Sequence, residues 1–441
     1  MSATNWNKNK WTVVLLFGII GQIAWAVENM FFNLFVFDKV DQNLDAITLM
    51  VQASGIVATI VTLIAGTFSD KVGNRKTFMC WGYVLWGITV ALFGVLTPTN
   101  LGSIFSIGAQ QSIIVALVAV IVTDCVMTAF GSTANDACFN AWVTDNTSET
   151  IRGRIESIIS ILPLFAMLLV VGGFGIIKDL VGYTVLFIIM GAIISLCGVV
   201  GFFIIKDSPA LEKSGRFADI VYGFKPSVIK EHGNLYVTLL ITCVYSIACQ
   251  IFMPFIVIYM RSYLGFETIE YSLSFGVAII AGSILNVIVG KLTDKIDKNK
   301  AMFIGCAIFS LGLLLMYLIK GMDHATTLVL FTIAGFVMIC GNVFILTLTS
   351  AKIRDYTPEK AVGKLQGVRM IFTVLIPMFV GPLVGNSINK LANIPLVDAG
   401  ADAMTTSYIP APEIFLVASI LTSVMIPLIL WLIKLVKNKQ N

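Results

Sequence analysis

The chain has 441 residues, of which 57% are hydrophobic and only 12% are charged. About a quarter of the residues in a soluble domain are charged, so this composition excludes a soluble globular protein. The formal net charge of +4 comes from Lys and Arg residues near the ends of apolar runs. Such placement is a membrane-topology signal and does not indicate a nucleic-acid-binding surface.

Apolar runs of membrane-spanning length follow one another along nearly the whole chain. A hydrocarbon core about 30 Å thick needs about 20 apolar residues per helix. This length predicts twelve membrane-spanning helices, over 12–37, 45–68, 77–96, 112–138, 155–177, 184–205, 235–260, 271–290, 301–319, 326–350, 365–388 and 411–434. The sequence therefore predicts an all-α polytopic protein of the cell membrane, surrounded by the lipid bilayer.

Lys and Arg residues set the orientation of these helices. With the N-terminus inside, 24 of the 29 Lys and Arg residues fall in inner segments and five in outer segments. Because positive residues accumulate on the cytoplasmic side, both termini are predicted to be cytoplasmic. Residues 206–234 then form a central cytoplasmic loop that is too short for a core of its own.

Two sequence repeats relate the halves of the chain. Residues 66–76 and 290–300 share Gly, Asp and Lys at an offset of 224, and residues 142–154 and 352–364 share Asp, Glu and Gly at an offset of 210. Parallel repeats are typical of transporters whose halves are related by an axis along the membrane normal. The predicted segments are a six-helix half, the central loop and a second six-helix half: 1–205, 206–234 and 235–441.

Residues 66–76 read Gly-Thr-Phe-Ser-Asp-Lys-Val-Gly-Asn-Arg-Lys and resemble the signature between helices 2 and 3 of the major facilitator superfamily. Glu149, Arg152 and Gly153 resemble the family's element between helices 4 and 5. The resemblance covers essentially the whole chain and implies the major facilitator fold with alternating access. It also implies a latch on the cytoplasmic side, with the candidate residues Gly66, Asp70, Lys71, Gly73, Arg75, Arg152 and Asp294.

These loop residues have a physical role in a protein whose halves rock. Gly66 is expected to allow close helix approach, and Asp70 is expected to face the positive end of a neighbouring helix. Asp70 would also pair with Arg152 or Arg75. Alternatively, the charges only set the topology. The second copy has Asn299 in place of Arg75, so the stronger latch is expected in the first half.

Two acids, Glu28 and Asp124, interrupt apolar spans of the first half at similar depth. A charged acid at mid-bilayer costs about 2.5 to 3.5 kcal/mol on insertion scales, so each should be paired, protonated or facing water. Neither has an evident Lys or Arg at its depth, and the second half has no counterpart acid. This pattern favours a coupling site for H⁺ or Na⁺. The alternative is a structural pairing of Glu28 or Asp124.

Polar and aromatic residues inside the spans are candidates for a substrate cavity, which is expected between the halves near the midplane. On an α-helix, Asp124, Thr128, Gly131 and Asn135 share one face. The candidate cavity residues are Trp25, Asn29, Phe32, Asn33, Thr128, Asn135, Tyr245, Gln250, Asn286, Asn342 and Arg369. The polar ones could instead form ordinary hydrogen bonds between membrane helices.

These features favour a secondary active transporter of a small molecule that works as a monomer. Cation-coupled uptake of a sugar, glycoside or other small polar compound ranks first, because residues 73–76, Trp81, Tyr83 and Trp86 also resemble glycoside-pentoside-hexuronide cation symporters. One alternative is proton-coupled efflux of amphipathic compounds, and another is a membrane sensor that binds a ligand without moving it. No nucleophile-and-base pair, phosphate loop or metal-ligand cluster stands out, so neither enzyme activity nor a cofactor is predicted.

Overall fold

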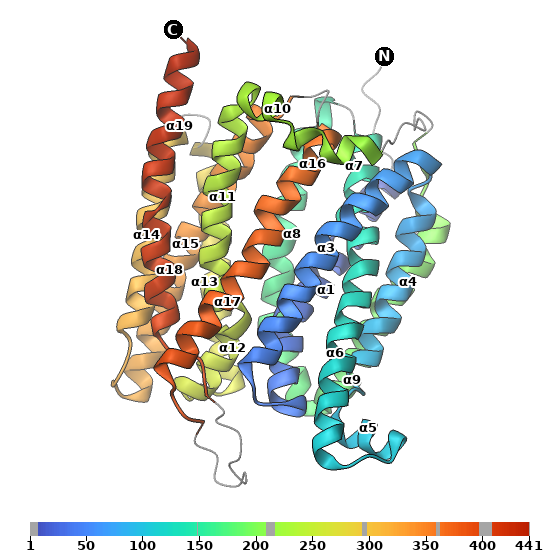
Figure 1. The fold of residues 1–441 in the computed structure, drawn as a ribbon, viewed down its shortest axis with the longest axis vertical. Helices are drawn as coiled ribbons and strands as arrows, with labels where there is room; N and C mark the ends of the chain where they lie inside the picture. The colour runs from blue at the N-terminus through green and yellow to red at the C-terminus, as the bar shows by residue number, and fades with distance from the viewer. Residues whose placement is uncertain are drawn as a thin grey trace. The chain divides into compact units, whose positions relative to one another are not determined.

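A computed structural model describes residues 8–147, 149–208, 217–292, 298–358, 362–396 and 408–440. The described residues form two compact helical units (Figure 1). Unit 1 is drawn from residues 1–41 and 56–218, and unit 2 from residues 42–55 and 219–441. One boundary falls inside the predicted central loop 206–234. The grouping of residues 42–55 with unit 2 is not apparent from the sequence repeats.

Unit 1 is a bundle in which α4 packs on α6 and α9, and α1 packs on α8 and α9 (Figure 1). Helix α3 begins in unit 2 and continues in unit 1. The elements from the start of the chain are α1 (Lys8–Val27), η1 (Glu28–Phe32), α2 (Asn33–Phe35), η2 (Val36–Val40), α3 (Leu44–Val72), α4 (Lys76–Phe93), α5 (Pro98–Phe105), α6 (Ala109–Gly131), η3 (Ser132–Phe139), α7 (Asn140–Asn146), α8 (Glu149–Leu169), η4 (Val170–Phe174) and α9 (Gly175–Ile204).

Unit 2 is a second bundle, in which α14 packs on α15 and α18, α11 packs on α17, and α13 packs on α15. Its elements are η5 (Phe217–Phe224), α10 (Pro226–Glu231), α11 (Gly233–Phe252), η6 (Met253–Phe255), α12 (Ile256–Ile258), η7 (Tyr259–Tyr263), α13 (Thr268–Leu292), α14 (Lys298–Leu318), α15 (His324–Tyr356), α16 (Val362–Met370), η9 (Ile371–Leu375), α17 (Ile376–Ala392), α18 (Glu413–Ser423) and α19 (Met425–Gln440).

The described residues contain eleven helical stretches that are long and apolar enough to cross a membrane. One of them, Ile161–Ile204, has 44 residues. A continuous helix of this length would measure about 66 Å, about twice the thickness of a hydrocarbon core. Gly182 interrupts it with a φ of 78°, so the stretch covers most of two predicted spans, 155–177 and 184–205. The all-α membrane fold with twelve spans is therefore confirmed.

Glycine residues bring helix backbones into direct contact in both units. In unit 1, a Cβ atom added to Gly87 of α4 would collide with the backbone of Gly191 on α9, and the reverse addition would collide with Gly87. In unit 2, Gly312 of α14 and Gly341 of α15 each lie against the backbone of the opposite helix. Lipid provides no hydrophobic force between helices, so such close packing is a main source of their association.

Some helices contain π-helical segments, in which hydrogen bonds run from residue i to i+5 and the turn is wider. Segments η2 and η7 occupy corresponding places in helices 1 and 7 at the offset of 224. Segments η1 and η3 have no π-helical counterpart. At the repeat offsets, η1 corresponds to the 3₁₀ turn η6, which contains Pro254, and η3 corresponds to part of the continuous helix α15. Unit 1 is thus irregular at η3, where the corresponding part of α15 is regular.

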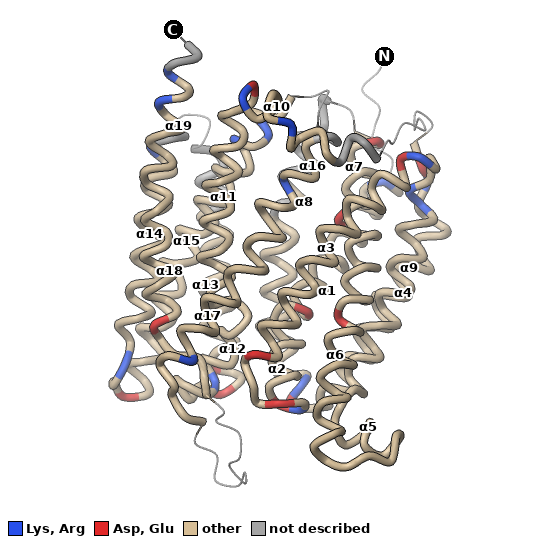
Figure 2. Tube along the Cα trace, viewed as in Figure 1, with Lys and Arg blue, Asp and Glu red and all other residues tan. Residues whose placement is uncertain are grey.

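Charged residues gather near the helix ends in each unit, and only a few red or blue segments interrupt the tan helices between them (Figure 2). Large apolar side chains such as Ile64, Ile114 and Ile284 are exposed along the helices, as expected for surfaces that face lipid. All eight cysteines are free, and each is buried or half-buried.

Candidate functional site

The first candidate site is the buried carboxyl group of Glu28 in unit 1. Glu28 is the first residue of η1 and is only 7% exposed. The hydroxyl of Thr128 on α6 donates a hydrogen bond to Glu28 Oε1 at 3.1 Å, so this predicted cavity residue belongs to the acid site. The other oxygen, Oε2, is buried and has no hydrogen-bond partner among the described residues. Such an oxygen is costly to bury and requires a proton or another ligand.

Asp124 lies one turn before Thr128 on α6 and is 1% exposed. It is close enough to Glu28 for its charge to act on that carboxyl group, and no Lys or Arg in the described part of the chain does so. The structure therefore brings together the two acids that the sequence selected. Two carboxyl groups placed in this way resist simultaneous ionisation in a medium of low dielectric constant. The pair is suited to hold one proton.

A third acid, Asp136, extends this site and was not predicted. It lies half-buried on η3, and Ser132 donates a hydrogen bond from Oγ to Asp136 Oδ2 at 3.0 Å. The spacing of a regular α-helix selects Gly131 and Asn135 to continue the face of Asp124. The turn of η3 is wider, and Asp136 lies close enough to Glu28 for its charge to act on that carboxyl group. The start of a π-helical segment has no clear sequence signal, which explains the omission.

Several predicted cavity residues are buried inside unit 1. Phe32 is fully buried and stacks on Phe93 with ring centroids 3.9 Å apart. Asn33 is 2% exposed and donates its amide to a backbone carbonyl of its own helix. Asn135 donates its amide to the Tyr83 hydroxyl at 2.8 Å. In this conformation the three side chains are buried, and their role in a substrate cavity stays a prediction.

Trp25 and Asn29 retain more access. Trp25 is half-buried, packs on Trp86 with ring centroids 4.9 Å apart, and lies beside Asp136. Asn29 is exposed, and its amide donates to the Trp25 carbonyl at 2.8 Å. In unit 1 these two residues therefore remain candidates for contact with a solute, and they adjoin the acid site.

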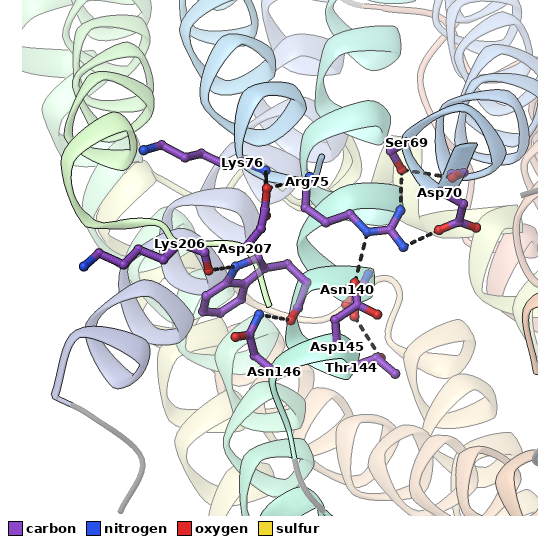
Figure 3. Close-up of polar contacts among 12 residues, drawn as sticks. Ser69, Asp70, Arg75, Lys76, Asn140, Thr144, Asp145, Asn146, Lys206 and Asp207 are labelled. Carbon is purple, nitrogen blue, oxygen red and sulfur yellow. Dashed lines mark hydrogen bonds and ion pairs between the residues drawn. The ribbon is translucent and has the colours of Figure 1, made fainter. Parts of the chain in front are cut away.

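The second candidate site surrounds Arg75 at the start of α4 (Figure 3). The Arg75 side chain is 5% exposed and forms ion pairs with Asp70 and Asp145, the latter with Nε 3.1 Å from Oδ2. Arg75 Nη1 also donates to Ser69 Oγ at 2.5 Å. Burial lowers the pKa of Arg75 while the two carboxylates raise it, and the net direction is upward from the ordinary value. Arg75 is therefore charged, and the predicted pair with Asp70 is present.

Asp207 and Trp142 also form hydrogen bonds at this site, and neither residue was predicted. Asp207 follows α9 and accepts hydrogen bonds from the backbone N–H groups of Arg75 at 3.2 Å and Lys76 at 3.0 Å. A carboxylate here satisfies donors that the start of α4 leaves unpaired, and it faces the positive end of the helix dipole. Trp142 donates its indole N–H to the Lys206 carbonyl at 2.9 Å. Segments far apart in the sequence thus meet around Arg75 (Figure 3).

The two glycines of the 66–76 motif differ in their role. Gly73 has a φ of 69°, a left-handed conformation that favours glycine, so the turn between α3 and α4 requires it. A Cβ atom added to Gly66 would meet the Ala137 Cβ at 3.9 Å, an ordinary contact, so close approach does not depend on Gly66 here. Lys71 is exposed. Two further predicted gate residues lie outside the described residues: the side chain of Arg152 and all of Asp294.

Unit 2 carries polar side chains, but its described membrane helices have no buried acid. Tyr245 is 5% exposed, and its hydroxyl donates to the backbone carbonyl of Asn342 at 3.5 Å, so it belongs to the packing. The side chains of Asn342 and Gln250 are half-buried. Arg369 is exposed on α16 and makes no ion pair with any described residue. The side chain of Asn286 lies outside the described residues.

Comparison with known proteins agrees with this helical arrangement. The family model described as Major Facilitator Superfamily matches residues 14–382 and, in a second match, residues 238–440. A search of curated proteins found no match.

Solved structures with a similar fold include three that their titles describe as transporters. The D-xylose-proton symporter has a TM-score of 0.72 at 13% identity, with 95% of this chain and 96% of that chain covered. The nucleoside transporter NupG has a TM-score of 0.67 at 11% identity, with coverage of 97% and 100%. A bacterial homolog of the human lysosomal transporter Spinster has a TM-score of 0.64 at 12% identity, with coverage of 98% for both chains. At such low identity, the likeness concerns the fold.

Proposed function

We propose that this chain, which belongs to the major facilitator superfamily, is a proton-coupled transporter that takes up a small polar solute by alternating access. The chain is a multi-pass membrane protein and a transporter of this family. The observation that carries the finer proposal is the buried pair of Glu28 and Asp124 in unit 1. A group that binds and releases one proton as access alternates can couple the proton gradient to solute movement.

The chemistry of the acid site favours H⁺ over Na⁺. A hard cation such as Na⁺ needs several oxygen ligands, as Ca²⁺ and Mg²⁺ do. Glu28 Oε2 is instead a single buried oxygen whose missing hydrogen-bond partner is supplied if the carboxyl group carries a proton.

A hydroxylated solute, such as a sugar or glycoside, is the substrate class we propose. Trp25 offers a half-buried aromatic surface, and Asn29, Asn342 and Gln250 offer amide groups that donate and accept hydrogen bonds. Arg369 adds a charged donor without an ion-pair partner in the described chain. The titles of two structural neighbours name D-xylose and nucleosides, which both contain a sugar ring.

The orientation that we propose places both termini and the Arg75 cluster on the cytoplasmic side, and the protein would act as a monomer. The excess of Lys and Arg in the segments on that side supports this orientation. In the same proposal, residues 1–205 and 235–441 are the halves that rock, and residues 206–234 are the loop between them. The ion pairs of Arg75 would then belong to the cytoplasmic latch.

A flux screen in proteoliposomes tests the proposed function. The purified full chain would be reconstituted and offered radiolabelled D-xylose, a nucleoside and a β-glucoside under separately imposed pH and Na⁺ gradients. We expect accumulation of at least one solute that is driven by the pH gradient and abolished by a protonophore. Accumulation driven by a Na⁺ gradient alone would show that Na⁺ is the coupling ion. Export of amphipathic dyes would show that the protein is an efflux transporter. Solute binding without flux would indicate a sensor.

A further inference from the structure

We propose that Asp136 is a proton-relay residue that connects the buried Glu28–Asp124 pair to the end of unit 1 that carries Arg75. This inference rests on the proposed proton-coupled function and adds a route for the proton. The Glu28 carboxyl group is buried, so a proton reaches it or leaves it only along polar groups that cross the surrounding apolar packing. The question is which groups provide that route.

A row of oxygen-bearing side chains follows one helix away from Glu28. Thr128 donates to Glu28 at 3.1 Å, and one turn later Ser132 donates to Asp136 at 3.0 Å. From Asp124 to Asp136 the row extends at most about 18 Å along the helix axis. Each hydroxyl can accept one hydrogen bond while it donates another, which is the property that a proton relay needs.

The end of this row is more accessible than its beginning. Asp136 is half-buried, whereas Glu28 and Asp124 are buried. Asn140, one turn beyond Asp136, is exposed, and its amide donates to the Asp136 backbone carbonyl at 3.0 Å. Helix α7, which begins at Asn140, also contains Asp145, and Asp145 pairs with Arg75. The row therefore leads from the buried pair to the charged end of unit 1.

A purely structural role explains these features less well. Ser132 could cap its own helix without an acid, and an acid in a membrane helix carries an insertion cost that is largest, about 2.5 to 3.5 kcal/mol, at the bilayer centre. The groups that act on Asp136 are Ser132 and Trp25, with no Lys or Arg among the described residues to balance a charge. Asp136 thus resembles Glu28 in being an acid without a cation, which suits a group that gains and loses a proton.

The transfer conserves protons at each step. Protonated Glu28 gives its proton to the Thr128 oxygen as Thr128 releases its own proton, and the same exchange occurs at Ser132 through one bridging water. The Asp136 carboxylate accepts the proton and becomes a carboxylic acid, while Glu28 becomes a carboxylate. Asp136 then releases the proton to water at the Arg75 end. Loading of Glu28 from this side runs through the same steps in reverse.

Time-resolved infrared spectroscopy after a pH jump tests the relay and needs no solute. The full chain in lipid is used, and the carbonyl band of protonated Glu28 is assigned as the band that disappears in Glu28→Gln. We expect Asp136→Asn to slow the change of this band by about tenfold or more, while its final amplitude stays the same. Ser132→Ala should slow it as well, and Asp136→Glu should restore most of the rate.

Asp38→Asn is the matched control, because Asp38 belongs to the same unit, lies on η2 and accepts a hydrogen bond from Tyr183 at 2.7 Å. It should leave the rate unchanged.

An unchanged rate in Asp136→Asn would overturn the relay. A lost Glu28 band in folded Asp136→Asn would also overturn it, because Asp136 would then set the protonation of Glu28. If Asp136→Asn fails to fold, Ser132→Ala is compared with Ser132→Thr, which keeps the hydroxyl group. A slower change of the Glu28 band in Ser132→Ala than in Ser132→Thr supports the relay, and an unchanged rate in Ser132→Ala overturns it. Failure of the flux screen is a separate result.

Discussion

Helix 4 in unit 1 and helix 10 in unit 2 are copies of one repeat, yet only the first carries acids within its predicted membrane span. Along α6 and η3 the polar row consists of Asp124, Thr128, Ser132 and Asp136. At the offset of 210, the corresponding residues of α15 are Ala334, Met338, Asn342 and Leu346. Helix α15 is also continuous, whereas unit 1 has the π-helical segment η3.

In helices 1 and 4 of unit 1, titratable side chains and irregular backbone occur together. A π-helical segment costs regular hydrogen bonding and is often found at functional sites. Segments η1 and η3, which have no π-helical counterpart in unit 2, each contain an acid of the site around Glu28. Unit 1 is therefore suited to proton coupling, and unit 2 offers polar groups that do not titrate.

The largest effect is expected for Glu28→Gln. The substitution keeps the size of the side chain and a hydrogen-bond acceptor for Thr128, but it removes the proton-binding group. Gradient-driven accumulation of the solute identified in the flux screen should be lost, while exchange of labelled for unlabelled solute should persist at a reduced rate. Asp124→Asn should give the same uncoupled result if both acids form one site.

Glu270→Gln in unit 2 is the matched control for this change. Glu270 is paired with the exposed His324 and lies near the start of α13, so its loss should leave accumulation unchanged. Full accumulation by Glu28→Gln would remove the coupling role from unit 1. Glu28 would then be a structural hydrogen-bond partner of Thr128.

The next largest effect is expected for Arg75→Gln, which affects stability as well as transport. Arg75 is buried, and its loss would leave Asp145 and the half-exposed Asp70 without their cation. Breaking such a pair by removing one partner should cost about 2 kcal/mol or more. Thermal unfolding of the purified protein measures this loss. Lys71→Gln, an exposed change in the same turn, should have little effect, and an equal loss in both variants would contradict the assigned role of Arg75.

Asp70→Asn tests the latch with little change in the stability of the protein, because the Asp70 side chain is 40% exposed. Exposed ion pairs contribute about 0.2 to 1 kcal/mol, so unfolding should change little. Solute binding should also stay intact, while the rate of transport falls. Loss of binding together with an unchanged conformational equilibrium, measured by distance labels on the two units, would assign Asp70 to the solute site instead.

Sequence reasoning succeeded where a pattern reports a physical rule directly. Apolar length predicted the spans, because every membrane helix must bury its own backbone polar groups. The loop motif also predicted the Asp70–Arg75 pair. It failed where the pattern assumed regular geometry: Asp136 was missed because η3 is π-helical. Asp207 was missed because no local signal connects the end of α9 to the start of α4.

A smaller effect is expected for Asn342→Leu and Gln250→Leu in unit 2. If these amides donate hydrogen bonds to the solute, the affinity should fall by about tenfold, the usual range for one lost hydrogen bond. Dependence on pH should not change, since neither side chain titrates. Competition binding and the pH profile of transport measure the two quantities. A cysteine at either position that never reacts with water-soluble thiol reagents would exclude a cavity role.

The smallest effect is expected for Asp45, a helical acid of unit 2. Asp45 lies in the first turn of α3, and its Oδ1 is 2.6 Å from Lys390 Nζ on α17. Both side chains are about half exposed, so the pair should contribute about 0.2 to 1 kcal/mol. A double-mutant cycle with Asp45→Asn and Lys390→Gln, read by thermal unfolding, measures this coupling. Asp45→Asn should also keep full gradient-driven accumulation, because its partner is a cation and solvent reaches it. Loss of accumulation in this variant would mean that coupling chemistry is not confined to the acids of unit 1.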